Sequence, residues 1–178
     1  MPPSPVSTGF AVIGSFNSKI CTSNSNYYQP RGRHLILGAK QSLIVDSSAT
    51  GTTGSMILGG IYNSASNSSL SHIIGGCCNH MTNATSSVIA GGTLNTSSGA
   101  FSGILGGTNN KINNHNCSFI IGADITSTAN CTTFVNNFHS TGSNGSSNVV
   151  ILANLPTSDP GVAGQVWRSG NDLKISTG

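Results

Sequence analysis

The chain has 178 residues, of which 36% are hydrophobic and only 6% are charged, and its formal net charge is +3. Ordinary globular chains carry about 25% charged residues, whereas this chain contains no glutamate at all. This composition excludes helices stabilised by ion pairs along one face, and no stretch has the spacing of an amphipathic helix.

The N-terminal third predicts an extended segment followed by irregular coils. Residues 1–9 are rich in Pro and Ser, and we expect them to be extended and to attach the chain to a larger particle. We do not expect them to be a signal peptide, and no apolar run reaches the ~20 residues of a membrane span. Residues 10–54 contain two degenerate copies of an apolar run followed by Gly, "FAVIG" and "LILGA", with a polar insertion at 21–33.

A regular repeat occupies residues 55–126. The phrases "MILGG", "HIIGG", "VIAGG", "GILGG" and "FIIGA" follow one another, and their first glycines are separated by 16, 16, 15 and 16 residues. A fixed period this short indicates one small structural unit per repeat, stacked on its neighbours. Three apolar residues are too few for a helix, so we predict short strands that stack as a parallel β-solenoid.

A polar residue comes three positions after the second residue of each Gly pair. This residue is Asn63, Asn79, Asn95 and Asn110 in the first four copies and Thr126 in the fifth. We expect the glycines to supply the positive φ that a tight turn needs. We expect each asparagine to bond its own backbone two residues further on.

The apolar triplets predict burial on both faces of the strand. The middle position is always isoleucine: Ile57, Ile73, Ile89, Ile104 and Ile120. The next position, on the opposite face, is Leu58, Ile74, Ala90, Leu105 and Ile121. A strand that is apolar on both faces is normally covered on both, and so thin a coil needs another copy of the chain to cover the second face. Closed symmetry then predicts a homo-oligomer, which Ile89→Asp should abolish.

The C-terminal third departs from the repeat. Residues 127–147 predict a cap over the last coil followed by a Gly/Ser/Asn linker, because the open end of a solenoid exposes strand edges. Residues 148–178 predict a small β tip, with a hairpin turn at "SGND".

Few residues suggest chemistry. His72 takes a repeat position held by Met or Val, so we expect it on a buried face, as a polar layer or as an ion ligand on a symmetry axis. Cys77 and Cys78 should face opposite ways on a strand, which favours free thiols over a zinc site with His80. Asp124 is the only acid in the regular repeats, whereas hydrolases of sugars use paired carboxylates. The sequence therefore predicts no enzyme, no cofactor and no metal.

The loosely grouped cations Arg31, Arg33 and Lys40 are the only basic cluster, and Tyr27 and Tyr28 lie close to them in sequence. A nucleic-acid site needs a basic stripe with stacking aromatic residues. We interpret the group as a solvated loop, so we expect neither nucleic acid nor membrane as a partner.

The phrases "GGIYN", "GGCCN", "GGTLN" and "GGTNN" resemble the head repeats of trimeric autotransporter adhesins and the related left-handed β-rolls of phage and virus fibres. The repeat here is longer than in the adhesins. The segment "LPTSDPGVAGQVWRSGNDLKIS" resembles a C-terminal element of bacteriophage and marine-virus tail fibres. These resemblances imply a homotrimer wound around a common axis.

Together, residues and resemblance predict an all-β protein, a parallel left-handed β-solenoid intertwined as a homotrimer with a small β-hairpin tip. The expected role is a virion structural protein, a tail or capsid fibre or spike on the particle exterior. Its expected partners are other virion proteins, through residues 1–9, and a host receptor or glycan. A bacterial trimeric adhesin head and a polysaccharide depolymerase tailspike are the alternatives.

Overall fold

The computed structural model describes residues 10–22, 33–46, 54–139 and 152–178. The chain divides into two compact units, Met1–Asn137 and Phe138–Gly178. All regular secondary-structure elements in the described ranges are β-strands. None of these residues forms a helix that could cross a membrane. The expected N-terminal attachment segment, residues 1–9, lies outside the described ranges.

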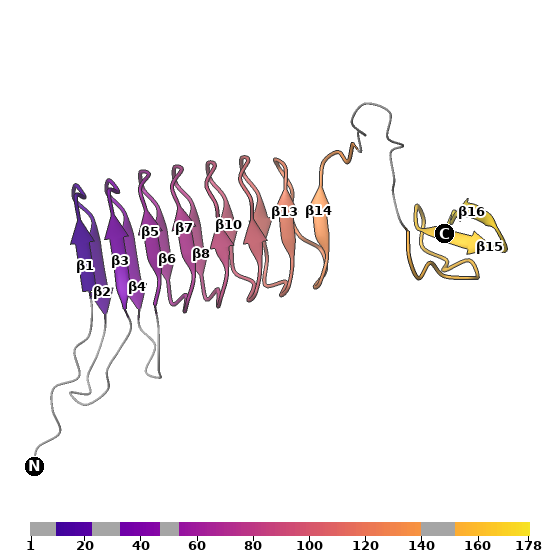
Figure 1. The fold of residues 1–178 in the computed structure, drawn as a ribbon, viewed down its shortest axis with the longest axis horizontal. Helices are drawn as coiled ribbons and strands as arrows, with labels where there is room; N and C mark the ends of the chain where they lie inside the picture. Colours follow the sequence, from indigo (N-terminus) through magenta and orange to yellow (C-terminus); the bar gives the residue numbers. More distant parts are fainter. Residues whose placement is uncertain (1–9, 23–32, 47–53, 140–151) are drawn as a thin grey trace, which may run out of the picture. The chain divides into compact units, whose positions relative to one another are not determined.

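The first unit is a roll of two parallel sheets (Figure 1). The first sheet contains, in order, β1 (Phe10–Ile13), β3 (His34–Leu37), β5 (Met56–Leu58), β7 (His72–Ile74), β9 (Val88–Ile89), β11 (Gly103–Ile104), β13 (Phe119–Ile121) and β14 (Thr133–Val135). The second contains β2 (Lys19–Thr22), β4 (Leu43–Asp46), β6 (Ser64–Ser66), β8 (His80–Thr82), β10 (Thr96–Ser97) and β12 (Lys111–Ile112). Each complete coil therefore places one strand in each sheet, and the predicted all-β solenoid architecture is confirmed.

The core consists of apolar side chains that both sheets direct into the space between them. From β3 to β13 the first sheet contributes one isoleucine per coil, and each is fully buried: Ile36, Ile57, Ile73, Ile89, Ile104 and Ile120. The second sheet contributes Ile44, Ala65, Met81 and Ile112, each at most 1% exposed. The pairing register sets equivalent residues side by side, as in Ile57 with Ile73. The inner face of each strand is thus filled within one chain.

A ladder of asparagines runs along one edge of this core. The backbone N–H of Asn79 donates to Oδ1 of Asn63, and that of Asn95 donates to Oδ1 of Asn79, both at 3.0 Å. The Asn79 side-chain amide donates to the carbonyls of Gly75 and, in the next coil, Gly92. The expected bond from each asparagine to its own backbone two residues on is therefore wrong. The amide instead joins successive coils, because its full burial leaves only turn and coil backbone as partners.

A ladder of serines borders the opposite edge of the core. Its members precede the first-sheet strands and are at most 3% exposed: Ser55, Ser71, Ser87, Ser102 and Ser118. The Ser87 hydroxyl donates to the carbonyl of Gly99 at 2.8 Å and accepts the N–H of Ser102 at 3.1 Å. These short side chains satisfy backbone groups where the chain turns into each new coil.

The second position of each Gly pair requires glycine for two reasons: its φ is positive, and the next coil packs closely against it. Gly76 has a φ of +79°, and a Cβ built there would overlap the carbonyl oxygen of Gly92 in the next coil. Gly59, a first glycine, has open space around it and needs only its φ of +71°. Coils can therefore stack this closely only where the second position lacks a side chain.

The fifth repeat makes its turn with one residue fewer. The N–H of Ile125 donates to Oδ1 of Asn110 at 3.1 Å, so Ile125 and not Thr126 occupies the asparagine position. Beyond this turn, β14 pairs in parallel with β13 and sets Phe134 beside Ile120. Phe134 packs against the core as a partly buried side chain. The described part of the expected cap thus continues the stack by one strand and places an aromatic ring at its end.

In the second unit, β15 (Val166–Ser169) and β16 (Asp172–Ile175) form an antiparallel pair. Asp159 accepts the Ser176 hydroxyl at 2.6 Å and the N–H of Gly161 at 2.9 Å. These bonds, the first of them most strongly, hold the pKa of Asp159 below its usual value.

Candidate assembly interface

An apolar stripe runs along the outer face of the first sheet. We call it the outer stripe, and it consists of the residue that follows the core position in each strand: Ile13, Leu37, Leu58, Ile74, Ala90, Leu105, Ile121 and Val135. Direct register pairs connect Ile13 with Leu37, Leu37 with Leu58, Leu58 with Ile74, and Ile121 with Val135. At about 4.8 Å between strands, its eight rungs extend over roughly 34 Å.

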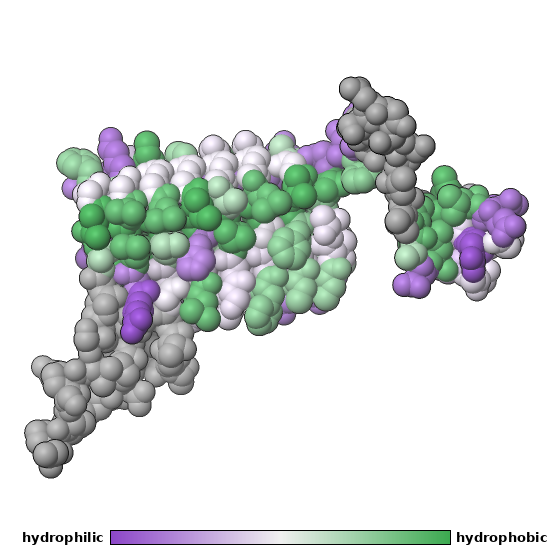
Figure 2. Space-filling view, in the orientation of Figure 1, coloured by the Kyte–Doolittle hydropathy of each residue, from purple (hydrophilic) through white to green (hydrophobic). Residues whose placement is uncertain are grey.

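The outer stripe is open to solvent in the single chain. Leu37 is 42% exposed, Ile74 47% and Leu105 56%. Figure 2 shows the resulting hydrophobic band crossing the strands of the roll. Contiguous apolar bands of this kind mark interaction surfaces. Of the two strand faces expected to be buried, only the inner face is buried within the single chain. That another copy of the chain buries the outer face stays a prediction.

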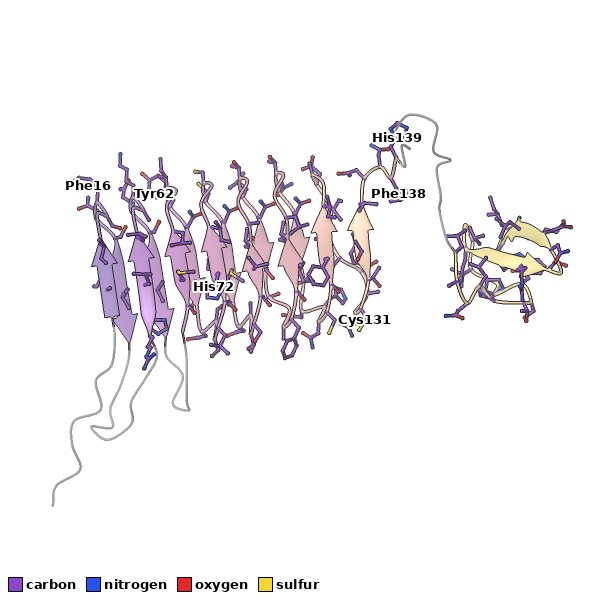
Figure 3. The ribbon with its side chains drawn as sticks, viewed as in Figure 1. Phe16, Tyr62, His72, Cys131, Phe138 and His139 are labelled. Carbon is purple, nitrogen blue, oxygen red and sulfur yellow. The ribbon has the colours of Figure 1, made fainter. Side chains whose placement is uncertain are left out.

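His72 lies beside the outer stripe and not in the core. Strand register places it between Met56 and Val88 on the outer face, and Figure 3 shows it over the middle of the roll. The residue is partly buried, and its Nδ1 atom is shielded from solvent without a hydrogen-bond partner among the described residues. Buried imidazole nitrogens normally have a hydrogen-bond partner, and the described part of the chain supplies none to this atom.

Ile89 belongs to the core of its own chain. It is fully buried between the sheets, so it is not the residue through which another copy would be contacted. That Ile89→Asp abolishes an oligomer stays a prediction, but the physical reason changes, because the buried charge would first disrupt the roll itself. The neighbouring Ala90 is on the exposed side.

The thiols of Cys77 and Cys78 converge. Both residues lie in the turn after β7, where Cys78 has a φ of +60°, and their sulfur atoms are 2.8 Å apart. Divergence was expected for a strand, and the left-handed backbone of Cys78 removes that alternation. This contact raises the pKa of Cys77, with a smaller contribution from burial. His80 lies in β8, where its Nε2 contacts the Thr82 hydroxyl.

No group of three or more metal-ligating side chains occurs in the ranges that the structure describes. Asp124 lies in a turn of the fifth repeat, where it accepts the side-chain amide of Asn109 at 2.9 Å. Among the loosely grouped cations, the Nζ atom of Lys40 lies 5.9 Å from the ring centroid of Phe16. Arg31 and both tyrosines of that region lie outside the described ranges.

The turn edge that follows the first-sheet strands carries a second exposed apolar set, which sequence reasoning missed. It consists of Phe16, Ile61, Tyr62 and Leu94, each at least 41% exposed. Figure 3 places Phe16 and Tyr62 together at this edge of the roll. The available signal was an apolar residue one or two positions after a Gly pair, or after the degenerate pair Gly14-Ser15, because these positions lie in the turn of their coil.

No protein-family model, curated protein or solved structure was found to match this chain.

Proposed function

We propose that this chain is a structural subunit of a virus particle, a fibre or spike on the particle exterior, and that three copies associate through their outer stripes. The outer stripe carries the proposal. It spans all eight strands of the first sheet at a constant rung spacing, and a second copy of the chain, parallel and in register, matches that spacing rung for rung.

The geometry of the stripe favours a rod-shaped partner over a globular one. Its rungs are single side chains that repeat from strand to strand, so a complementary surface must repeat with the same period. Closed rotational symmetry lets identical chains provide that surface to one another without leaving an open end. The trimeric state and the left-handed sense of the roll come from the resemblance of the "GG" repeats to fibre and adhesin rolls.

The virion assignment comes from the C-terminal segment, whose sequence resembles tail-fibre termini. On this proposal the roll projects outward and contributes rigidity. Its continuous apolar core and its two polar ladders stabilise it with few charged residues. The work is mechanical and needs no catalytic group.

The oligomeric state is tested by light scattering on the full chain after size-exclusion chromatography. We expect the molar mass of a trimer for the native sequence and that of a monomer for Leu105→Asp, since three carboxylates would meet in the interface. Leu94→Asp is the matched control, because Leu94 is equally exposed (55%) but lies at the turn edge, at a φ of +58° that Asp tolerates. A monomeric native chain would contradict the proposal.

The particle assignment needs a separate measurement. An antibody against the full chain should label projections on purified virus particles in negative-stain images. Labelling of a bacterial envelope with no labelled virus particle would instead favour the adhesin-head alternative.

A further inference from the structure

Two exposed cysteines occupy the same place in successive coils. Cys117 and Cys131 each precede a first-sheet strand by two residues, and the first residues of those strands, Phe119 and Thr133, are direct register partners. Both cysteines have a φ of +54°, and both are solvent-exposed. Figure 3 shows Cys131 at the edge of the roll opposite Phe16 and Tyr62.

The residues before these cysteines tie the two turns together. Each cysteine stands in a short repeated phrase, "NCS" and "NCT". Oδ1 of Asn130 accepts the N–H of Asn116 at 2.8 Å, and the N–H of Cys131 donates to the carbonyl of Asn116 at 2.9 Å. Both the N–H and the carbonyl of Asn116 are therefore bonded to the next turn, which fixes the register of the two turns.

This stacking satisfies the geometry of a disulfide. Adjacent strands lie about 4.8 Å apart, within the Cα separation of roughly 4.4–6.8 Å that disulfides span. Equal φ values direct the two Cβ atoms the same way, and the paired strands that follow bring the two thiols close to each other. Local desolvation and this contact raise the pKa of Cys117, so an oxidised pair forms faster at alkaline pH, where more thiolate is present.

We propose that Cys117 and Cys131 are a modification site that forms an intrachain disulfide when the folded chain meets a small-molecule disulfide such as oxidised glutathione. One cysteine thiolate attacks the oxidant, forms a mixed disulfide and releases one glutathione thiolate. The second cysteine thiolate then attacks the protein sulfur and displaces the second glutathione. The protein loses two protons and two electrons, and oxidised glutathione is reduced to two thiols.

The bridge would clamp the end of the roll. It links the turn before β13 to the turn before β14, the last strand of the first sheet. Terminal coils have a neighbour on one side only and open most readily. Reducing compartments keep such thiols free, and oxidising surroundings close them, so the clamp would form after the chain leaves a reducing cytosol. This inference does not depend on the trimer.

Mass spectrometry of the full chain tests the bridge. The protein is incubated with oxidised glutathione or with a phosphine reductant, free thiols are alkylated, and the unfolded protein is cut with chymotrypsin. Cleavage after Phe119 and Phe134 separates the two cysteines, whereas trypsin leaves both between Lys111 and Arg168. We expect one disulfide-linked pair of fragments in the oxidised sample, which separates on reduction.

Variants and a second readout complete the test. Cys117→Ser or Cys131→Ser should each abolish the linked fragments, while the double variant Cys77→Ser/Cys78→Ser should retain them. Amide exchange in β14 should slow on the order of a hundredfold in the bridged form, as expected for a loop of about 15 residues. Separate alkylation or glutathione adducts on the two cysteines, or covalent dimers on a non-reducing gel, would overturn the bridge. Unchanged exchange would overturn the clamp.

Discussion

Ile73 and Ile74 are neighbours in β7, and they differ only in the face of the sheet to which they point. Ile73 is fully buried between the two sheets, whereas Ile74 is 47% exposed on the outer stripe. The same contrast recurs in the coils before and after it. Equal hydrophobicity therefore has two different roles here, because the inner residue stabilises the roll and the outer one remains available for association.

The most severe test of this contrast replaces each of the two neighbours by aspartate. Ile73→Asp buries a charge with no partner, which we expect to cost at least about 5 kcal/mol and to abolish the cooperative unfolding transition. Ile74→Asp should leave the strand signal in circular dichroism unchanged and should lower the molar mass in solution. Equal loss of structure in both variants would show that the two faces are not independent.

The asparagine ladder provides the next largest effect. Asn79→Ala removes two amide donations and leaves the N–H of Asn95 without its acceptor. We expect a loss of about 2–4 kcal/mol in the free energy of unfolding, measured by urea denaturation. Asn113→Ala, at an exposed position, is the control and should change stability by less than about 0.5 kcal/mol.

Adjacent serines in the second sheet should respond with opposite sign. The Ser97 hydroxyl is buried without a hydrogen-bond partner in the described part of the chain, so Ser97→Ala should raise stability by about 1 kcal/mol. The Ser98 hydroxyl donates to the carbonyl of Ile112 and accepts the N–H of Asn114. Ser98→Ala should therefore lower the urea midpoint. A destabilising Ser97→Ala would mean that this hydroxyl has a partner such as ordered water.

The smallest expected effect is a pH dependence from the second sheet. Burial lowers the pKa of His80, so the unfolded chain binds a proton more readily than the folded chain does. The folded state therefore loses stability relative to the unfolded state as the pH falls below about 6.5, where His80 of the unfolded chain becomes protonated. His80→Thr, which copies its register neighbour Thr96, should flatten this dependence when urea midpoints are compared at pH 8 and pH 5. An identical slope in both proteins would assign the dependence to other groups.

Much of the roll could be predicted because its repeat is short and strict. The core isoleucines, the positions of the first-sheet strands and the parallel stacking all follow from a period of 15 or 16 residues. The conformations of the turns were harder to predict from the sequence. A shortened turn puts Ile125 where Thr126 was expected, and a left-handed residue at Cys78 brings two thiols together that a strand would separate.

By itself, the sequence determined that the chain alternates apolar faces and returns to the same place every coil, since side-chain periodicity is a local property. Only the tertiary structure decided which polar groups meet. Asn63 and Asn79 are partners, and Cys117 and Cys131 stand in neighbouring turns, because coil-to-coil register brings together residues that are a full repeat apart. It also decided which apolar face stays uncovered within the chain, since the second sheet packs against the inner face of the first sheet and leaves Leu37, Ile74 and Leu105 exposed.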